Sequence, residues 1–564
     1  MPIEHEDRRK ASALHYSRFS GSLLMNSPDH DVLILGGGLA GLTLSLQLRD
    51  TLPDARIGVL ERACHPVPEG AHKVGESTVE IGAEYLSKTL GLEDHLDQCH
   101  LRKYGLRLFF DADRSHDLAK AGELGASHLL SLPSYQIDRG VLENHLAELA
   151  RARQIELLDG ARVRDVSLGQ DAPHEVTAEV DGQPRRFTAR WVVDALGRAS
   201  LIKRKLDLAE PNDHHCASVW FRIQDRIDVS DWSDDHSWQQ RCSQLPRWHS
   251  TNHLMGPGYW VWLIPLASGA TSIGIVFDRR MHDFDTLKSY DGVMNWLARH
   301  QPRCHRALDA SDGELMDFLY LRHISHGCRQ VFSEQRWALT GEAGVFLDPF
   351  YSPGSDFIAI SNTFITDLVR RDLAGQSIRR IVRQFERSYF SFYQSSLKLY
   401  RDQYEFFGHA RAMSAKTIWD YAYYWGVLAV VFFSGRLTDP RLLLRNGGAL
   451  ESLVALHADM QQMFLDWSRA EPSGARPGLF VNQSDMSLLV RLNRELTEVA
   501  DDADEALDAR LERNAEMLEQ LAAELASLAP SGTRPDAVSA VEQPLPEACL
   551  VLHDLPEAFL EPHP

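Results

Sequence analysis

Residues 31–41 read DVLILGGGLAG, a short apolar run that leads directly into a cluster of glycines. The run up to Leu35 is continuously apolar after its first residue, which is typical of a strand buried in a parallel sheet. Leu42 to Leu48 follow at helical spacing, and residues 55–61 (ARIGVLE) predict a second strand that ends at Glu61. Strand, glycine turn, helix and strand together predict one βαβ unit.

The glycines of this turn match the pattern G-x-G-x-x-G at Gly36, Gly38 and Gly41. In that pattern the first glycine permits a tight turn, the second lets a pyrophosphate approach the backbone, and the third allows the helix to pack closely on the sheet. The pyrophosphate then lies at a helix N-terminus, where free N–H groups and the helix dipole favour an anion. Glu61, twenty residues after the last glycine, is placed to accept hydrogen bonds from a ribose. The sequence therefore predicts a bound dinucleotide.

Two later segments favour FAD as a lasting cofactor over a transient NAD. Residues 192–197 (VVDALG) and 340–344 (TGEAG) each end an apolar run with an acidic residue and a glycine. An extended FAD touches the dinucleotide fold at one end and a remote loop at its flavin end, so distant segments of this kind are expected. Glu342 is a candidate to hold the ribityl hydroxyls.

Composition excludes several classes of protein. The chain has 564 residues, of which 44% are hydrophobic and 24% charged, and its formal net charge is −20. This is ordinary globular usage, and the acidic balance argues against a nucleic-acid partner. The seven cysteines form no C-x-x-C pair, so neither a metal site nor a disulfide framework is expected and a cytoplasmic location is the default. Residues 1–30 lack an apolar targeting core, and the most apolar stretch, 421–433, is too short to cross a membrane, which predicts a buried helix or an aromatic pocket wall.

The pattern along the chain predicts four parts. Residues 1–29 form a flexible arm, and 30–370 form an α/β core with an inserted antiparallel substrate-binding sheet at about 215–335. Residues 371–527 are helical, including an acidic amphipathic helix or pair at 496–526, and 528–564 form a loosely ordered tail.

Further motifs identify a family. After the glycine motif the chain carries G-E-S-T at 75–78, W-x-W-x-I-P at 260–265 and F-x-x-P-x-x-S-x-G at 346–354, in this order. With these motifs the chain resembles the flavin-dependent halogenases, on the phenol and pyrrole branch of the flavin monooxygenase-like proteins. The resemblance covers roughly residues 30–370, with a helical extension like that of the members that do not act on tryptophan. It implies a GR2-type FAD-binding domain that uses FADH2, O2 and a halide.

The resemblance also implies a catalytic lysine between the flavin and the substrate, and the matching position is Lys103. In this family a flavin C4a-hydroperoxide oxidises halide to hypohalous acid, which the lysine relays to the aromatic ring. An ammonium does this by hydrogen-bonding the hypohalite oxygen, and an amine does it by forming a haloamine. Burial lowers the pKa of a lysine and makes either role feasible near neutral pH. Lys73, just before the G-E-S-T loop, is the competing lysine.

The residues that the resemblance assigns fall into three sets. Trp260 and Trp262 share one strand face and form a wall of the flavin chamber, where two indoles are also ordinary core residues. Ser352 and Gly354 belong to the halide loop. The expected FAD contacts are Gly36, Gly38, Gly41, Glu61, Ser77, Arg139, Val163, Gly341, Glu342 and Ser355, where Arg139 is equally well explained by a salt bridge at a helix start.

Two departures from the family pattern bear on substrate and halide. Tyr351 stands where tryptophan halogenases carry a glutamate that assists ring deprotonation, which favours a phenolic or pyrrolic substrate. Pro353 has no N–H, so one backbone donor to the halide is lost, leaving Gly354 and neighbours such as the Ser352 hydroxyl. A lost hydrogen bond to a charged group costs about 1.5–3 kcal/mol, so we expect weaker halide binding, a preference for bromide or iodide, or no halogenation at all.

Two features of the sequence bear on possible partner proteins. We find no second nucleotide fingerprint for NAD(P)H, which predicts a separate flavin reductase. Arg379, Arg383 and Arg387 share one helical face within a basic run that begins at Arg370 and Arg371, which indicates either a solvated surface or a docking patch for an acidic carrier protein. The alternatives to a halogenase are an FAD-dependent monooxygenase or other oxidoreductase on the same fold, and a flavoprotein without catalysis.

Overall fold

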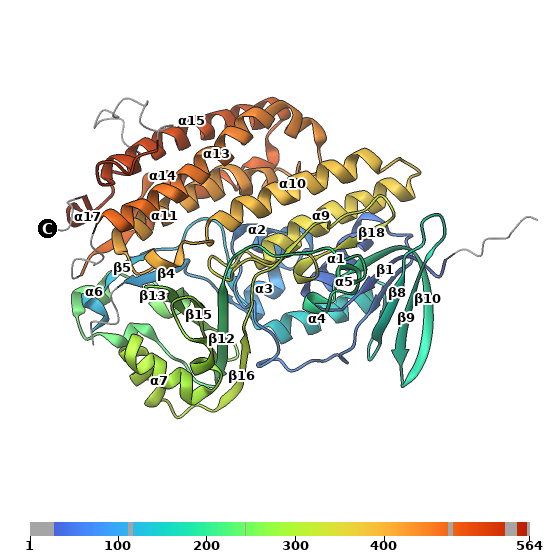
Figure 1. The fold of residues 1–564 in the computed structure, drawn as a ribbon, viewed down its shortest axis with the longest axis horizontal. Coiled ribbons are helices and arrows are strands. Elements are labelled where there is room, and N and C mark those ends of the chain that lie inside the picture. Colours follow the sequence, from blue (N-terminus) through green and yellow to red (C-terminus); the bar gives the residue numbers. More distant parts are fainter. Residues whose placement is uncertain (1–27, 111–116, 243, 472–477, 536–549, 561–564) are drawn as a thin grey trace, which may run out of the picture.

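The computed structural model describes residues 28–110, 117–242, 244–471, 478–535 and 550–560. The predicted arm at 1–29 therefore lies almost wholly outside the described residues. Within them the chain forms two large sheets, two short strand pairs and a layer of C-terminal helices (Figure 1).

The first sheet is built around the βαβ unit that the sequence predicts. β1 (His30–Leu35) pairs in parallel with β2 (Ile57–Leu60) on one side and with β10 (Gln183–Asp194) on the other. The remaining strands are β7 (Glu156–Leu158), β8 (Arg162–Ser167), β9 (His174–Val180) and β18 (Trp337–Leu339). Strand β1 lies inside the sheet between β2 and β10, and its side chains from Val32 to Leu35 are fully buried. Its continuous apolar run fits this position.

The second sheet has eight strands, and most of its neighbours are antiparallel as predicted. Its central strands are β12 (Cys216–Ile223), β13 (Thr251–Gly256), β14 (Tyr259–Pro265) and β15 (Thr271–Asp278), with β16 (Leu315–Leu321) at one edge. The sheet also recruits β4 (Leu106–Phe110), β5 (Gly122–Gly125) and β19 (Phe480–Asn482). The sheet therefore has more strands than the predicted insertion at 215–335 supplies, because β4, β5 and β19 come from outside that range.

Helices of the core connect and cover the sheets. They are α1 (Leu39–Thr51), α2 (Glu80–Glu84), α3 (Glu93–Cys99), α4 (Arg139–Ala152), α5 (Leu201–Lys205), α6 (His236–Gln240), α7 (Tyr290–His300) and α8 (Pro302–Asp309). Short strands pair outside the two large sheets: β3 (Leu101–Arg102) with β6 (Tyr135–Gln136), and β11 (Ala209–Glu210) with β17 (Gly327–Cys328).

The C-terminal helices, coloured yellow to red in Figure 1, lie along one side of the molecule. They are α9 (Gly354–Leu373), α10 (Arg379–Lys398), α11 (Ala410–Tyr423), α12 (Val430–Phe433), α13 (Pro440–Ala470), α14 (Ser487–Glu495) and α15 (Asp504–Leu528). A π-helical turn at Tyr424–Ala429 joins α11 to α12, and the apolar stretch 421–433 is a largely buried helical segment, as expected. The predicted acidic helix at 496–526 is one long helix, α15, preceded by a short turn.

Of the predicted tail at 528–564, the structure describes residues 528–535 and 550–560. Residues 550–560 pack against the helices and end in α17 (Glu557–Leu560). Val551, Leu555 and Phe559 are buried, and Arg411 donates to the Phe559 carbonyl at 2.9 Å. Only Phe559 of these three lies in α17, while Val551 and Leu555 lie in the turns before it. Among the described residues, no helix is both long enough and apolar enough to span a membrane.

Candidate active site

The glycine loop has the backbone geometry that its pattern predicts. Gly36 has φ of +106°, a conformation that only glycine adopts readily. A Cβ on Gly41 would lie 1.9 Å from the Gly36 carbonyl oxygen, so this glycine allows α1 to pack against the turn. The Gly37 N–H donates to Glu61 Oε2 at 2.6 Å, which fixes the carboxylate at the end of β2 beside the loop. Glu61 Oε1 also accepts from the Ala63 N–H at 2.8 Å, so both oxygens of the carboxylate are held beside the loop.

The surroundings of Gly38 fit the phosphates of FAD. A Cβ on Gly38 would lie 3.1 Å from Lys73 Nζ, so the ammonium reaches the place where a pyrophosphate approaches the loop. Lys73 pairs with Glu143 at 2.9 Å, and Arg139 at the start of α4 pairs with the same carboxylate. Arg139 Nε is buried without a hydrogen-bond partner among the described residues. An orphaned guanidinium N–H and a nearby ammonium suit a dianionic group, so the residues present fit the cofactor.

The remote segments proposed for FAD converge on the same loop. The Thr340 N–H donates to the Asp194 carbonyl at 3.1 Å, joining the ends of β18 and β10. A Cβ on Gly341 would lie 3.0 Å from Ala40 Cβ, which places this turn against the start of α1. Glu342 lies 3.7 Å from Arg198 and is about one-third exposed. Val163 lies on β8 of the same sheet.

Lys103 lies in the interior, directly after β3. Its side chain is buried, and Nζ donates to Ser77 Oγ at 3.0 Å and to the Thr78 carbonyl at 2.9 Å. Burial lowers the pKa of Lys103 to about 8, opposed by the fields of Glu80 and Asp356. Ser77, expected among the FAD contacts, thus contacts the lysine in this structure. The ammonium of the competing Lys73 instead lies beside Gly38 of the glycine loop.

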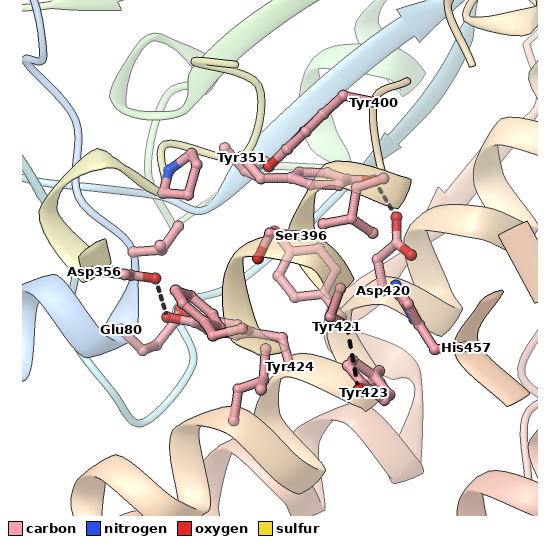
Figure 2. Close-up of a pocket in the computed structure, with 17 residues that line it drawn as sticks. Glu80, Tyr351, Asp356, Ser396, Tyr400, Asp420, Tyr421, Tyr423, Tyr424 and His457 are labelled. Atoms are coloured by element: carbon pink, nitrogen blue, oxygen red, sulfur yellow. Dashed lines mark hydrogen bonds between the residues drawn. The ribbon is translucent and has the colours of Figure 1, made fainter. Parts of the chain in front are cut away.

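A cavity lies between the core and the C-terminal helices (Figure 2), and Val79 and Glu80 of its lining directly follow Thr78, whose carbonyl accepts from Lys103. Glu80 comes from α2, Asp356 from the first turn of α9, and Asp420 from α11. Five tyrosines line the same cavity: Tyr351, Tyr400, Tyr421, Tyr423 and Tyr424. None of the described lining residues is a lysine or an arginine. The cavity is therefore aromatic, with carboxyl groups as its charged residues.

Three of these tyrosines direct their protons into the protein rather than toward a ligand. Tyr351 donates to Asp420 Oδ2 at 3.0 Å, and Tyr424 donates to Asp356 Oδ2 at 2.8 Å, as the dashed lines in Figure 2 show. Tyr400 donates to the Phe350 carbonyl at 3.0 Å. A phenolic oxygen whose proton is used has only lone pairs left to offer. These hydroxyls can therefore offer only acceptor lone pairs, and the Tyr424 oxygen already accepts from the Ile81 N–H at 3.0 Å.

Asp420 is the centre of a buried polar network. Lys416 Nζ lies 2.7 Å from its Oδ2, and Gln461 Nε2 donates to Oδ1 at 2.8 Å. Burial and the nearby charge of Asp420 raise the pKa of Tyr351 well above its usual value, so this phenol stays protonated. Tyr351 therefore does not replace the missing glutamate as a base.

Asp356 and Glu80 form the second acidic pair. The Gly82 N–H donates to Asp356 Oδ1 at 2.8 Å, and burial raises the pKa of Asp356 to about 7. Burial also raises the pKa of Glu80, whose Oε2 makes no hydrogen bond of ordinary geometry. Burial thus raises the pKa of both groups above that of an exposed carboxyl.

The predicted halide loop adopts a constrained turn ahead of α9. Tyr351 and Ser352 have φ of +67° and +57°, and the Ser352 N–H is used by the Pro349 carbonyl at 2.9 Å. Pro353 is the N-cap of α9, so the N–H groups of Gly354 and Ser355 open the helix, where no intrahelical acceptor exists for them. Ser355 Oγ would contact a Cβ on Gly82 at 2.2 Å, so its side chain faces α2.

Trp260 connects the second sheet to this loop. Trp260 and Trp262 are buried with ring centroids 5.6 Å apart, and Trp260 Nε1 donates to Tyr404 OH at 2.8 Å. Tyr404 in turn donates to Asp348 Oδ2 at 2.6 Å, and His214 contacts the same oxygen at 2.7 Å. The tryptophans are thus core residues that also hold the loop in place.

Most cavity residues were not singled out from the sequence. Glu80 lies two residues after the G-E-S-T loop and Asp356 two residues after the F-x-x-P-x-x-S-x-G motif, yet neither position belongs to a motif. The aromatic run at 421–425 (YAYYW) was the one available signal for a pocket wall, and Tyr421, Tyr423 and Tyr424 do line the cavity.

Comparisons with known proteins agree with this arrangement. Residues 29–261 match the family model described as "FAD binding domain". Flavin-dependent halogenase chlA of Dictyostelium discoideum is 27% identical over 430 residues, covering 71% of this chain and 70% of that protein. The 1H-pyrrole-2-carbonyl-[peptidyl-carrier protein] chlorinase of Pseudomonas fluorescens is 25% identical over 349 residues, covering 58% and 73%. The chain is thus similar to flavin-dependent halogenases, and its N-terminal part matches an FAD binding domain.

The fold of the chain also matches solved structures. The structure of halogenase PltM in complex with phloroglucinol and FAD superposes with a TM-score of 0.61, covering 89% of this chain and 97% of that chain at 18% sequence identity. The predicted fold class, an α/β FAD-binding monooxygenase fold with a helical C-terminal region, is confirmed, as is the predicted family.

Proposed function

We propose that this enzyme halogenates an electron-rich phenolic or pyrrolic ring, using reduced FAD, O2 and a halide, with Lys103 relaying the oxidised halogen. Residues that would hold the cofactor are the glycine loop, Glu61, Arg139 and the turn at Gly341. When bound in reduced form, the flavin supplies with O2 the two-electron oxidation of halide to hypohalous acid.

The observation that carries the proposal is the position of Lys103. Its ammonium contacts Ser77 and Thr78 of the loop that follows the cofactor-binding unit, while the fields of Glu80 and Asp356 reach it from the cavity wall. A cation held there hydrogen-bonds the oxygen of hypohalous acid and draws electrons from the halogen, which makes the halogen electrophilic. Because Lys103 is buried, an oxidant held there meets the aromatic ring in the cavity rather than solvent.

The lining of the cavity supports a neutral aromatic that carries hydrogen-bond donors. Tyr351, Tyr400 and Tyr424 present acceptors, and the charged residues of the lining are carboxyl groups. A ring hydroxyl or a pyrrole N–H satisfies such acceptors, and the same heteroatom activates the ring toward electrophiles. Phloroglucinol, present in the PltM complex, is a suitable first probe.

The proposal is tested by supplying FAD, a flavin reductase, NADH, O2 and bromide, and analysing phloroglucinol by mass spectrometry. We expect a bromide-dependent product in which bromine replaces one ring hydrogen. An oxygenated ring formed equally well without halide would instead support the monooxygenase alternative. Pro353 favours that alternative, because the N-cap of α9 brings no N–H to an anion.

Two partners belong to the same proposal. A separate reductase is expected to supply reduced flavin. For an aromatic tethered to a carrier protein, the exposed face of α10 at Arg379, Arg383 and Arg387 offers positive charge to an acidic partner. Arg370 and Arg371 do not extend this face, since they lie on α9 and pair with Asp367. The carrier protein in the name of the Pseudomonas relative supports this part of the proposal.

A further inference from the structure

Replacing an aromatic hydrogen by halogen releases a proton, and the cavity must contain a group that accepts it. Tyr351 occupies the position at which tryptophan halogenases carry a glutamate, and its phenol is protonated and donates to Asp420. Resting on the function proposed above, the question is which carboxyl group of the cavity takes this proton.

Asp420 is the least suitable of the three carboxyl groups. It forms a buried ion pair with Lys416 at 2.7 Å and also accepts hydrogen bonds from Gln461 and Tyr351. Protonating it would leave the Lys416 ammonium buried beside a neutral partner, which is unfavourable in a desolvated site. Asp420 therefore acts as a structural anion that orients Tyr351.

Asp356 has a different environment. It lies in the first turn of the 20-residue helix α9, where the dipole stabilises a carboxylate. Its two hydrogen bonds come from neutral donors, the Gly82 N–H and the Tyr424 hydroxyl, each to a different oxygen at 2.8 Å. Figure 2 shows Asp356 on the same side of the cavity as Glu80, opposite the Asp420 network. Each oxygen keeps a lone pair, and no ion pair is broken when one of them is protonated.

We propose that Asp356 is the catalytic base that accepts the proton released from the halogenated ring carbon, with Tyr424 as its positioning residue. The ring π electrons form the new carbon–halogen bond as the halogen–oxygen bond of hypohalous acid breaks, with its electron pair going to oxygen. That oxygen takes a proton from the Lys103 ammonium and leaves as water. The ring C–H pair restores aromaticity while its proton passes to an oxygen of Asp356, so that arene and hypohalous acid give haloarene and water.

The charges that face Asp356 agree with this role. Glu80 on α2 raises its pKa and Lys103 after β3 lowers it, while Tyr424 donates to it and Tyr400 lies within its field. Burial is the largest effect and brings the pKa of Asp356 to about 7. A base with this pKa is ionised enough to accept a proton near neutral pH and releases it readily after each turnover.

The test compares Asp356→Asn with Asp367→Asn, an aspartate of the same helix that pairs with Arg370 and Arg371. With phloroglucinol we expect Asp356→Asn to lower kcat about 100-fold or more with little change in KM, whereas the control stays near wild type. Using ring-deuterated phloroglucinol, the kinetic isotope effect on kcat should rise from about 1 to about 3 or more in Asp356→Asn, because proton loss becomes rate-limiting.

Two further measurements keep failure of this inference distinct from failure of the proposed function. Without aromatic substrate, trapping of hypohalous acid by monochlorodimedone should be unchanged in Asp356→Asn; no trapping by the wild-type enzyme would count against the halogenase function itself. In flavin-free protein, difference infrared spectra should show a carboxyl group that titrates near pH 7, is absent in Asp356→Asn, and moves to higher pH in Tyr424→Phe.

The outcomes that overturn the inference are specific. An unchanged kcat in folded Asp356→Asn would exclude Asp356 as the base. An equal loss of trapped hypohalous acid and of product would show that Asp356 acts on Lys103 or the halide instead. Circular dichroism and FAD binding of the variant establish that it is folded, and Tyr424→Phe carries the test if Asp356→Asn is not.

Discussion

The glycine loop and the cavity are built in opposite ways. The loop consists of residues 36–41 with Glu61 and works largely through backbone geometry, as the φ of Gly36 and the close approach at Gly41 show. The cavity is assembled from seventeen side chains that extend from Val79 to His457 and come from the core and from α9, α10, α11 and α13. A cofactor common to many proteins is bound by a short contiguous motif, whereas a particular substrate is met by side chains that only the tertiary fold brings together. We therefore expect substitutions in the glycine loop to weaken FAD binding, and substitutions in the cavity to change the kinetics of the substrate.

The largest effect is expected outside both regions, at Lys103, which contacts Ser77 and Thr78. Lys103→Ala removes this buried ammonium, so halogenation of phloroglucinol should fall at least about 1000-fold while flavin oxidation continues. Steady-state product analysis beside the rate of flavin oxidation checks this. Loss of both by the same factor would assign Lys103 to cofactor binding instead.

The pH dependence sharpens the role of Lys103. An ammonium loses its proton as the pH rises through the pKa of about 8, so product formation should fall above that value. A rate that instead rises through pH 8 would indicate that the amine acts by forming a haloamine.

In the glycine loop, Gly41→Ala should damage cofactor binding and the fold together. The new Cβ would lie 1.9 Å from the Gly36 carbonyl oxygen, so α1 must move, at a cost of about 1–3 kcal/mol. We expect a lower Tm and FAD binding weakened at least about tenfold, measured by thermal unfolding and flavin fluorescence.

A matched control is Gly448→Ala on the exposed face of α13, where a Cβ meets nothing within 4 Å. The same substitution there should raise stability by up to about 1 kcal/mol, because alanine is the better helix former. Equal destabilisation at both positions would contradict the packing argument.

In the cavity, Tyr351→Phe should affect the substrate and leave the cofactor alone. It removes an acceptor that faces the ligand and leaves Asp420 with Lys416 and Gln461 as partners. We expect the KM for phloroglucinol to rise about tenfold, as for loss of a hydrogen bond, while the Kd for FAD stays constant. A change in the Kd for FAD alone would place Tyr351 in the flavin chamber.

The smallest effect is expected at the surface of α10. Replacing Arg383 and Arg387 by Glu should leave turnover of free phloroglucinol unchanged and weaken turnover of a carrier-bound aromatic about fivefold, with a marked dependence on salt. Equal effects on both substrates would show that this face is only a solvated surface.

The sequence predicted the parts of the molecule that depend on local pattern. The βαβ unit followed from the apolar run before Gly36, and the antiparallel sheet followed from alternation between 215 and 280. The recruitment of β19 to that sheet was not predictable, because three residues carry no periodic signal. Asp356 and Glu80 escaped notice for a related reason. An acidic residue at a helix start looks like an ordinary first-turn charge until the fold buries it beside Lys103.

The central claim is that halide is oxidised on this protein, and it can be tested without knowing the aromatic substrate. Photoreduced FAD on the purified protein is mixed with O2, catalase and increasing bromide, and hypohalous acid is captured with monochlorodimedone. The account predicts bromination of the trap that saturates with bromide and approaches one equivalent per flavin oxidised. Flavin that is fully oxidised while the trap stays unmodified at every bromide concentration would contradict it.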